Sequence, residues 1–202
     1  MPTMPKYKIC RRLGPGVYEK CQTQKFVMSQ ARHAGKKGDK RPKALSDYGT
    51  QFLEKQRIRF TYGVREKQFG NYIKKASEKK GGHSAQALFG MLETRLDNII
   101  YRLGLANTRN LARQMVSHGH FLVNGKKTTV PSYHISEGDV ITVREGSRKS
   151  VLFQGLDKKL KNYSVPAWLN FNIEKMEAKV TGTPENTEGF LNFSSVLEFY
   201  SR

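Results

Sequence analysis

The chain has 202 residues, of which 36 are Lys or Arg and 17 are Asp or Glu, so its formal net charge is +19. That length allows one large domain or two smaller ones. A positive charge of this size favours a polyanionic partner, either nucleic acid or an acidic membrane surface. The chain contains no apolar run near the ~20 residues that cross a bilayer, and its first residues lack the apolar segment of a secretory signal. We expect a soluble intracellular protein with no membrane partner.

The positive charge is concentrated in the first part of the chain. Residues 1–80 contain 21 Lys and Arg against 6 acidic residues, whereas residues 81–202 contain 15 against 11. The run GKKGDKRPK at residues 35–43 has no apolar side chain and cannot bury surface by itself. We interpret residues 1–44 as a basic arm that follows phosphates, the alternative being a solubilising tail.

Three helices are predicted after this arm. Ser46–Asp47 is suited to begin a helix over about residues 48–62, which Gly63 can end. Apolar side chains at helical spacing predict a second helix over Glu66–Lys80, and a third is expected over Ser84–Glu93. The apolar stripe of the first helix is thin, and packing alone explains its cations poorly. We therefore interpret the basic residues in and near these helices as RNA contacts: Lys55, Arg57, Arg59, Arg65 and Lys67.

A fourth helix is predicted from the stretch ETRLDNIIYRLG, with Gly104 as its C-terminal cap. At ~100° per residue, Arg95 and Arg102 fall on one flank of its apolar stripe, while Glu93 and Asp97 fall on the other. A helix exposed only to water has no reason to sort its charges in this way. We therefore predict that Arg95 and Arg102 face RNA.

Residues 107–126, NTRNLARQMVSHGHFLVNGK, predict a fifth helix followed by a hairpin. Thr108 can cap this helix. Its buried side is expected to consist of four apolar residues: Leu111, Ala112, Met115 and Val116. Arg109, Arg113 and Ser117 follow at intervals of four on the opposite side, which places two guanidinium groups about one turn apart on an outward ridge. Arginine suits phosphates and base stacking, so this ridge is a candidate RNA grip.

Two histidines, His118 and His120, follow this helix. If the chain is extended there, both rings project toward the ridge, where imidazoles can stack on bases or bind phosphates; a surface turn is the alternative. Asn124–Gly125 is a strong signal for a two-residue hairpin turn. This turn is expected to bring Lys126 and Lys127 near the same region.

Together these elements predict an α+β fold, with a mostly helical basic N-terminal region and a compact RNA-binding domain of two helices and short strands. We expect residues 1–93 to form the basic arm and helical domain, residues 94–155 the small RNA-binding domain, and residues 156–202 a C-terminal segment that docks back onto the body. Alternating apolar residues within this segment indicate a small hairpin over about residues 171–180.

The sequence gives no reason to expect catalysis, a metal or a cofactor. Cys10 and Cys21 are far apart for a zinc-binding pair and no CxxC occurs, so we interpret them as two free cysteines. Phosphate-binding glycine loops are absent. Arg95–Asp97 reads RLD, like the motif of pseudouridine synthases in which the aspartate attacks uridine. However, the usual Thr and Gly after RLD are missing, and the chain that follows is too short for a synthase domain.

The run LETRLDNIIYRLG, followed by TRNLARQMVSHGHFLVNG and SYHISEGD, resembles the small RNA-binding domain first named for ribosomal protein four of the small subunit. That domain also occurs in tyrosyl-tRNA synthetases, pseudouridine synthases and a heat-shock protein. Six further stretches, in order along the chain, resemble the bacterial and organellar family of ribosomal protein four itself: LSDYG (45–49), EKQ (54–56), YGVREKQFGNY (62–72), PAWL (166–169), KME (175–177) and EFYSR (198–202).

This resemblance implies a non-enzymatic ribosomal protein. Members of the family bind small-subunit rRNA early, at a helix junction in its 5′ domain, and nucleate assembly of the subunit body. They contact a neighbouring small-subunit protein, influence translational accuracy and line the channel through which mRNA enters. The last role is assigned by the resemblance to Lys40, Arg41 and Lys43. The implied location is the cytoplasmic ribosome, or the ribosome of an organelle.

Two features depart from the family pattern. Many members carry four N-terminal cysteines that bind zinc, whereas Cys10 and Cys21 alone occur here, and RHAG (32–35) stands where GQHG is common. Two other classes of protein remain as alternatives. One is an RNA-modifying enzyme, and the other is a stress factor that uses the same small domain on stalled large subunits and does not need residues 1–80.

Overall fold

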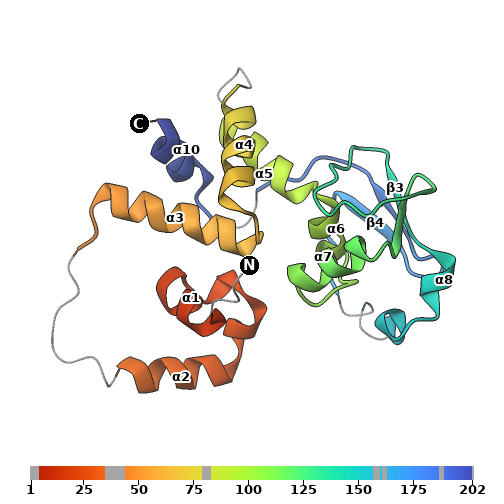
Figure 1. The fold of residues 1–202 in the computed structure, drawn as a ribbon, viewed down its shortest axis with the longest axis horizontal. Helices are drawn as coiled ribbons and strands as arrows, with labels where there is room; N and C mark the ends of the chain where they lie inside the picture. The colour runs from red at the N-terminus through yellow and green to blue at the C-terminus, as the bar shows by residue number, and fades with distance from the viewer. Residues whose placement is uncertain are drawn as a thin grey trace. The chain divides into compact units, whose positions relative to one another are not determined.

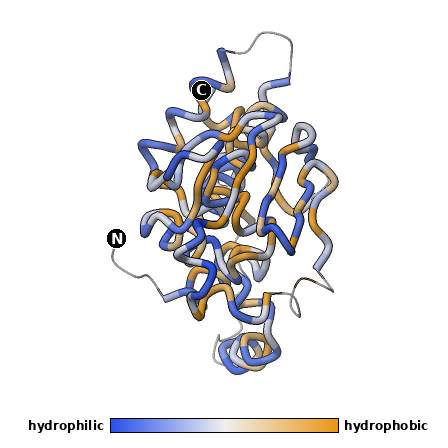
Figure 2. The backbone as a smooth tube through the Cα atoms, turned by 90° about the vertical axis from the view of Figure 1, so that its right-hand side faces the viewer, coloured by the Kyte–Doolittle hydropathy of each residue, from blue (hydrophilic) through white to orange (hydrophobic). Residues whose placement is uncertain are grey.

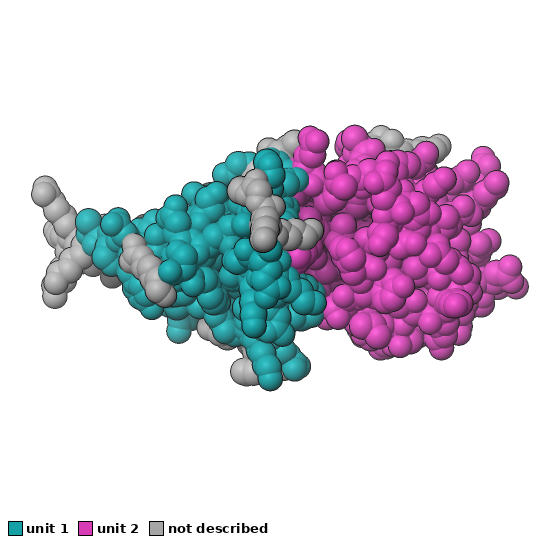
Figure 3. Space-filling model, turned by 90° about the horizontal axis from the view of Figure 1, so that it is seen from above, with its two compact units in different colours: residues 1–88, 186–202 teal, residues 89–185 magenta. Residues whose placement is uncertain are grey.

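The computed structural model describes residues 5–34, 44–78, 83–156, 160, 163–186 and 189–201. The chain forms two units, one of residues 1–88 with 186–202 and the other of residues 89–185 (Figure 3). Helices build the first unit, and the second combines helices with an antiparallel sheet, so the predicted α+β fold is confirmed. The domain boundaries expected after residues 93 and 155 remain a prediction.

The helices predicted after residue 44 are present in the first unit, but residues 6–34, interpreted as part of a basic arm, form helices that the sequence analysis did not predict (Figure 1). The predicted helix over residues 48–62 is confirmed as α3, at whose start the Ser46 Oγ accepts a hydrogen bond from the Gly49 N–H. The second predicted helix ends at Ser77 rather than Lys80, and residues 79–82 lie outside the described part of the chain. The elements of this unit are α1 (Lys6–Leu13), η1 (Pro15–Val17), η2 (Glu19–Gln22), α2 (Gln24–Ala34), α3 (Asp47–Thr61), α4 (Glu66–Ser77) and α10 (Phe193–Ser201), with α5 (Ser84–Glu93) spanning the division between the units.

The N-terminal helices enclose a small core of their own. Its buried residues are Ile9, Cys10, Leu13, Val17, Cys21 and Phe26. Cys10 on α1 and Cys21 on η2 form a disulfide within it, with their Cα atoms 6.4 Å apart. The prediction of two free cysteines is therefore wrong. The reason is that η1 turns the chain back so that α1 meets η2, which spacing along the sequence does not reveal.

Reduction of this disulfide is expected to destabilise the N-terminal core by about 3 kcal/mol, because a crosslink that closes a short loop restricts the unfolded chain. Amide hydrogen exchange in α1 and η2 should accelerate after treatment with dithiothreitol, while the sheet of the second unit keeps its protection. The double variant Cys10→Ser, Cys21→Ser should match the reduced protein. Unchanged protection of α1 upon reduction would contradict the expected role.

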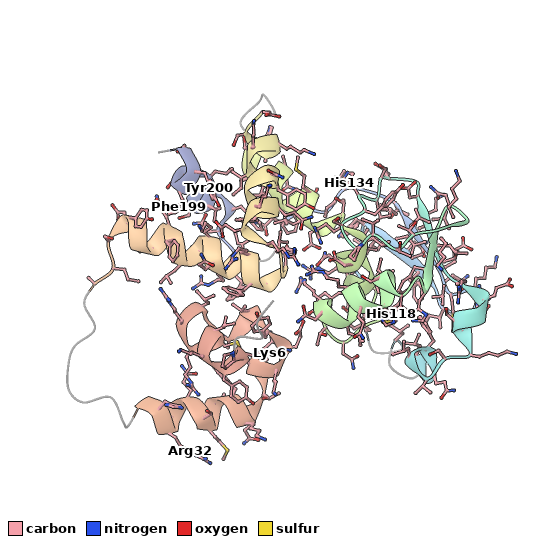
Figure 4. All side chains as sticks on the ribbon, in the orientation of Figure 1. Lys6, Arg32, His118, His134, Phe199 and Tyr200 are labelled. Carbon is pink, nitrogen blue, oxygen red and sulfur yellow. A yellow bond between two sulfur atoms is a disulfide. The ribbon has the colours of Figure 1, made fainter. Side chains whose placement is uncertain are left out.

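The helix α10 packs against α3 (Figure 1), and Phe199 and Tyr200, labelled in Figure 4, help to enclose Lys55 at this contact. The Lys55 Nζ lies 2.7 Å from the Glu66 Oε1 and 4.9–5.6 Å from the ring centroids of Phe52, Phe199 and Tyr200. An ammonium group surrounded by aromatic rings and a carboxylate gains both cation–π and ionic attraction. Lys55 is thus a packing residue, 7 % exposed, that holds the C-terminal helix.

The neighbouring cations of α3 also have partners within the first unit. Arg57 donates from Nε to the Leu13 carbonyl at 2.7 Å, and Arg59 donates from Nε and Nη2 to the Gln56 Oε1. The interpretation that packing explains these cations poorly is therefore wrong. Several of their partners, such as Leu13 for Arg57 and Phe199 for Lys55, lie far away in the sequence, so the pattern of α3 alone could not show them.

Tyr200 should report on this contact in an alkaline titration. Its hydroxyl donates to the Glu66 Oε1 at 3.0 Å, and burial, followed by this bond, raises the pKa of Tyr200 from 10.0 to about 12. A raised folded pKa favours the protonated state, so the stabilisation is complete below pH 10.0 and is lost as the pH rises through about 12. The difference in ultraviolet absorbance between the parent and Tyr200→Phe isolates this titration. A midpoint near pH 10 would contradict the docked position of α10.

The second unit places helices and a five-stranded antiparallel sheet around one core. Its elements are α6 (Leu96–Arg102), α7 (Arg109–Ser117), α8 (Glu145–Arg148), η3 (Val151–Phe153), β1 (Phe121–Val123), β2 (Lys126–Lys127), β3 (Val140–Val143), β4 (Leu169–Asn172) and β5 (Glu177–Val180), with strand order β2-β1-β3-β5-β4. Asn124 and Gly125 have φ values of 49° and 78°, as a type I′ turn requires, so the predicted hairpin is confirmed.

The C-terminal segment contributes to both units. The hairpin expected near residues 171–180 is confirmed as β4 and β5, which extend the sheet because β5 pairs with β3 in the register Ile141↔Ala178. The segment's last helix, α10, belongs to the first unit. Figure 2 shows hydrophobic and hydrophilic residues alternating along the helices and strands. Within the described residues, no helix is both long and apolar enough to cross a membrane.

Candidate nucleic-acid interface

The helix α6 begins later than its sequence pattern predicts. The predicted helix is interrupted at Thr94 and Arg95, where the backbone pairs with the segment that precedes β3. The Leu96 N–H donates to the Tyr133 carbonyl at 2.9 Å, and the Ile135 N–H donates to the Thr94 carbonyl at 2.9 Å. This pairing turns Arg95 out of the helix and places it beside Asp97, so the predicted sorting of charges on one continuous helix is wrong.

Asp97 lies at the centre of an ionic cluster between α6 and α7. Arg95 donates from Nε to the Asp97 Oδ1 at 3.0 Å and from Nη2 to the Asp97 Oδ2 at 2.8 Å. Arg113 donates from Nε and Nη2 to the same Oδ2 at 2.9 and 2.8 Å. The side chains of Arg95 and Asp97 are 4 % and 3 % exposed, whereas that of Arg113 is 32 % exposed. A direct phosphate contact does not fit the burial of Arg95, while Arg113 reaches the surface.

Glu93 organises a second, linked cluster. Arg102 donates from Nη2 to the Glu93 Oε1 and from Nε to Oε2, both at 2.9 Å. Asn98 donates to the Glu93 Oε2 at 2.8 Å and accepts a hydrogen bond from the Arg109 Nε at 2.8 Å. The guanidinium of Arg109 also lies 4.2 Å from the ring centroid of Tyr101. The guanidinium groups of Arg109 and Arg113 are therefore both bonded to α6.

This geometry corrects part of the predicted ridge. The helix α7 and its Thr108 cap are confirmed, since the Thr108 Oγ1 accepts from the Leu111 N–H at 3.1 Å. Arg109 and Arg113 are half-buried against α6, however, and do not point straight out to solvent. Ser117, the last member of the ridge, is exposed. Spacing along α7 placed these residues on one face but could not show that α6 supplies acceptors for them.

The chain turns sharply at the foot of α7. His118 ends the helix in a helical conformation and Gly119 has a φ of 73°, so the extended conformation expected across the two histidines is wrong. Their ring centroids nevertheless lie 6.1 Å apart. Burial, followed by the positive charges of His118 and Arg144, lowers the pKa of His120 below its usual value. His120 Nδ1 also shares a 2.9 Å hydrogen bond with the Ser147 hydroxyl.

Gly119→Ala is expected to destabilise the second unit by roughly 1–2 kcal/mol, because a side chain disfavours the left-handed backbone. The added methyl group would also displace the end of the Lys127 side chain, which is flexible and can move at little cost. Thermal unfolding monitored by circular dichroism tests the loss. Gly125→Ala is a matched comparison, since its φ of 78° is similar but no atom lies within 4 Å of its added Cβ. Similar losses are expected in the two variants, because the left-handed backbone is their common cause, and no loss in Gly119→Ala would contradict it.

The remaining predicted contacts fall into three groups. Lys126 and Lys127 on β2, together with Arg65 and Lys67 at the start of α4, are exposed and available to a partner. The three cations of α3 are bonded within the first unit, as described above. The residues assigned to the mRNA channel, Lys40, Arg41 and Lys43, lie outside the described part of the chain.

Arg144 is a surface cation that the sequence analysis missed. Its side chain is exposed, and its backbone N–H donates to the His120 backbone carbonyl at 2.9 Å. The register Phe121↔Val143 places it beside His120 at the end of the paired strands. Pairing the two predicted strands in this register would have identified it. Arg144 adds a charge to the surface formed by His118, His120 and Lys127.

Among the described residues, no group of three or more His, Cys, Asp or Glu side chains could hold a metal ion. The surface around α7 instead presents cations. Two of them, Arg109 and Arg113, are held by the buried acceptors Asn98 and Asp97. Such an arrangement matches the shape-and-backbone recognition typical of structured RNA. The fold and this surface define an RNA-binding protein.

Comparison with known proteins identifies the family. The model of the ribosomal protein S4/S9 N-terminal domain matches residues 2–93, and the S4 domain model matches residues 94–141. The small ribosomal subunit protein uS4 of Halothermothrix orenii is 42 % identical over 203 residues, which cover 98 % of this chain and 97 % of that protein. The same protein of Sulfurihydrogenibium sp. is 44 % identical with the same coverage, and that of Geobacillus kaustophilus is 42 % identical over 99 % of this chain and 98 % of that protein.

The chain therefore belongs to the uS4 family of small ribosomal subunit proteins. This confirms the resemblance seen in the sequence. The family is structural and non-enzymatic, which confirms the prediction that the chain is not an enzyme.

Proposed function

We propose that this protein is a structural constituent of the small ribosomal subunit that binds the subunit's rRNA directly. The observation that carries the proposal is the likeness to uS4 along nearly the whole chain, through both the N-terminal domain and the S4 domain. A stress factor that shares only the small domain would not require the match over residues 2–93.

The proposed binding site in the second unit consists of Arg109, Arg113, Lys127, His118 and Arg144, and its target is a helix junction in the 5′ domain of the rRNA. A junction presents phosphates in a fixed constellation, and A-form RNA is recognised mainly by shape and backbone. Guanidinium groups held in place by α6 suit such a target, because few rotamers must be frozen upon binding. The exposed Lys126 next to Lys127 extends the same positive surface.

Several finer roles belong to the same proposal. Early binding would nucleate assembly of the subunit body, and contact with a neighbouring small-subunit protein would influence translational accuracy. The basic run at residues 35–43 would line the channel through which mRNA enters, with Lys40, Arg41 and Lys43 as contacts. The proposed location is the ribosome of the cytoplasm or of an organelle.

Co-sedimentation tests the proposed function most simply. The protein, expressed with an affinity tag in bacterial cells, should migrate with small subunits and remain bound after a high-salt wash that removes loosely associated proteins. A cytosolic protein of similar charge but without an S4 domain serves as the control. Release in the first salt wash would overturn the assignment as a constituent, and migration with large subunits would favour the stress factor.

A further inference from the structure

We propose that two buried carboxylates, Glu93 and Asp97, are positioning residues for RNA binding: they fix the guanidinium groups of Arg109 and Arg113 before RNA arrives. The inference rests on the proposed rRNA-binding function and deepens it. Neither carboxylate touches RNA in this account, since each is at most 3 % exposed and would repel phosphate. Their contribution is the orientation of the arginines.

Asp97 holds Arg113 along one edge of its guanidinium group. Nε and Nη2, which form one edge of the guanidinium plane, both donate to the Asp97 Oδ2. Two charge-assisted bonds from one edge to a single oxygen hold that edge of the guanidinium at Asp97. Arg95 pairs with both oxygens of the same carboxylate from the buried side. Asp97 can therefore anchor Arg113 while Arg95 compensates its charge.

Glu93 orients Arg109 through the side-chain amide of Asn98. Asn98 donates from Nδ2 to the Glu93 carbonyl at 3.1 Å and to the Glu93 Oε2 at 2.8 Å, which determines how its side chain is turned. Its Oδ1 consequently faces the Arg109 Nε. Arg102 pairs with Glu93 and compensates its charge, as Arg95 does for Asp97. Stacking over Tyr101 then fixes the plane of Arg109.

This arrangement explains why carboxylates occur within an RNA-binding surface. The cluster joins four guanidinium groups to two carboxylates, so it remains cationic. A flexible arginine loses side-chain entropy when a phosphate immobilises it, whereas an arginine already fixed in the free protein loses less. The acids thus favour a specific phosphate constellation over phosphates in general.

The substitution Asp97→Asn gives two opposite expectations. It adds one positive charge, so electrostatics alone predicts tighter binding to every RNA. An amide has one acceptor oxygen and no charge, so it cannot accept all four bonds that Arg95 and Arg113 donate to Asp97. Positioning therefore predicts about tenfold weaker binding to 5′-domain rRNA, the loss of roughly one charge-assisted contact, with binding to bulk tRNA undiminished.

Glu145→Gln is the matched control, because it removes one carboxylate from an exposed position on α8. It should bind 5′-domain rRNA at least as tightly as the parent. If Asp97→Asn, shown by circular dichroism to be folded, binds this RNA as tightly as Glu145→Gln, the positioning role is overturned and the proposed function stands. If the parent itself prefers 5′-domain rRNA no more than tRNA, both are overturned.

A measurement on the free parent protein decides the matter even if Asp97→Asn does not fold. Nitrogen-15 NMR reports the rate of rotation about the Nε–Cζ bond of individual arginines. Rotation should be slow for Arg109 and Arg113 and fast for the exposed Arg144. Equally fast rotation in all three would show that the carboxylates do not hold the guanidinium groups and would overturn the inference.

Discussion

Replacing Asp97 with Ala is expected to lower the free energy of unfolding of the second unit by about 3–5 kcal/mol, the range found when one partner of a buried ion pair is removed. Arg95 has a 4 % exposed side chain and donates two hydrogen bonds to this carboxylate. Without Asp97, the buried guanidinium loses the anion that compensates its charge. Urea unfolding followed by the fluorescence of Trp168, which packs against the core of this unit, measures the loss.

A double substitution distinguishes a lost ion pair from a general packing defect. In Arg95→Met, Asp97→Leu both charges are replaced by apolar side chains, an exchange that is often neutral or stabilising for buried pairs. This variant should regain at least half of the stability lost in Asp97→Ala. A double variant less stable than Asp97→Ala would mean that the ion pair is not the source of the effect.

The second large effect concerns RNA. Arg109→Ala, Arg113→Ala is expected to weaken binding to small-subunit rRNA by about 100-fold, since each guanidinium should supply a charge-assisted contact worth at least tenfold. Two lost phosphate contacts should also flatten the log–log dependence of affinity on salt by roughly 1.4–1.8. Filter binding over a salt series gives both quantities.

The control for this variant removes the same charge elsewhere. Lys74 and Lys75 are exposed on α4 in the first unit, so Lys74→Ala, Lys75→Ala has the same net charge as the arginine variant. General electrostatics predicts a modest loss for this control. Equal losses in the two double variants would mean that the positive charge acts as a whole and that α7 has no special role.

Local signals in the sequence predicted the elements that carry the site. The Thr108 cap, the turn at Asn124–Gly125 and the left-handed Gly104, with a φ of 74°, each depend on a few neighbouring residues, and the structure has all three. The apolar side of α7 was also correct, with Ala112, Met115 and Val116 buried and Leu111 partly buried. These features determine that α7 and the hairpin exist and roughly where they lie.

Most of the features that the sequence did not predict depend on partners from another element of the chain. Arg113 bonds to Asp97 on the preceding helix, and Lys55 is enclosed by rings from the C-terminus. Periodicity tells which face of a helix a side chain occupies, but not which polar group from another element meets it. For this reason Arg109 and Arg113 were predicted to be more exposed than they are.

The measurement that most directly tests the central claim is a competition between two RNAs for the parent protein. Labelled 5′-domain rRNA of the small subunit is bound on filters and displaced by bulk tRNA or by the unlabelled 5′ domain, at several salt concentrations. If the protein binds this rRNA specifically, tRNA should compete at least about 1,000-fold less well at physiological salt. This factor is at the lower end of the ratio of specific to non-specific affinity for nucleic-acid-binding proteins, roughly 10³–10⁷. If tRNA competes as well as the 5′ domain at every salt concentration, the cations form a non-specific coat and the account of α6 and α7 is wrong.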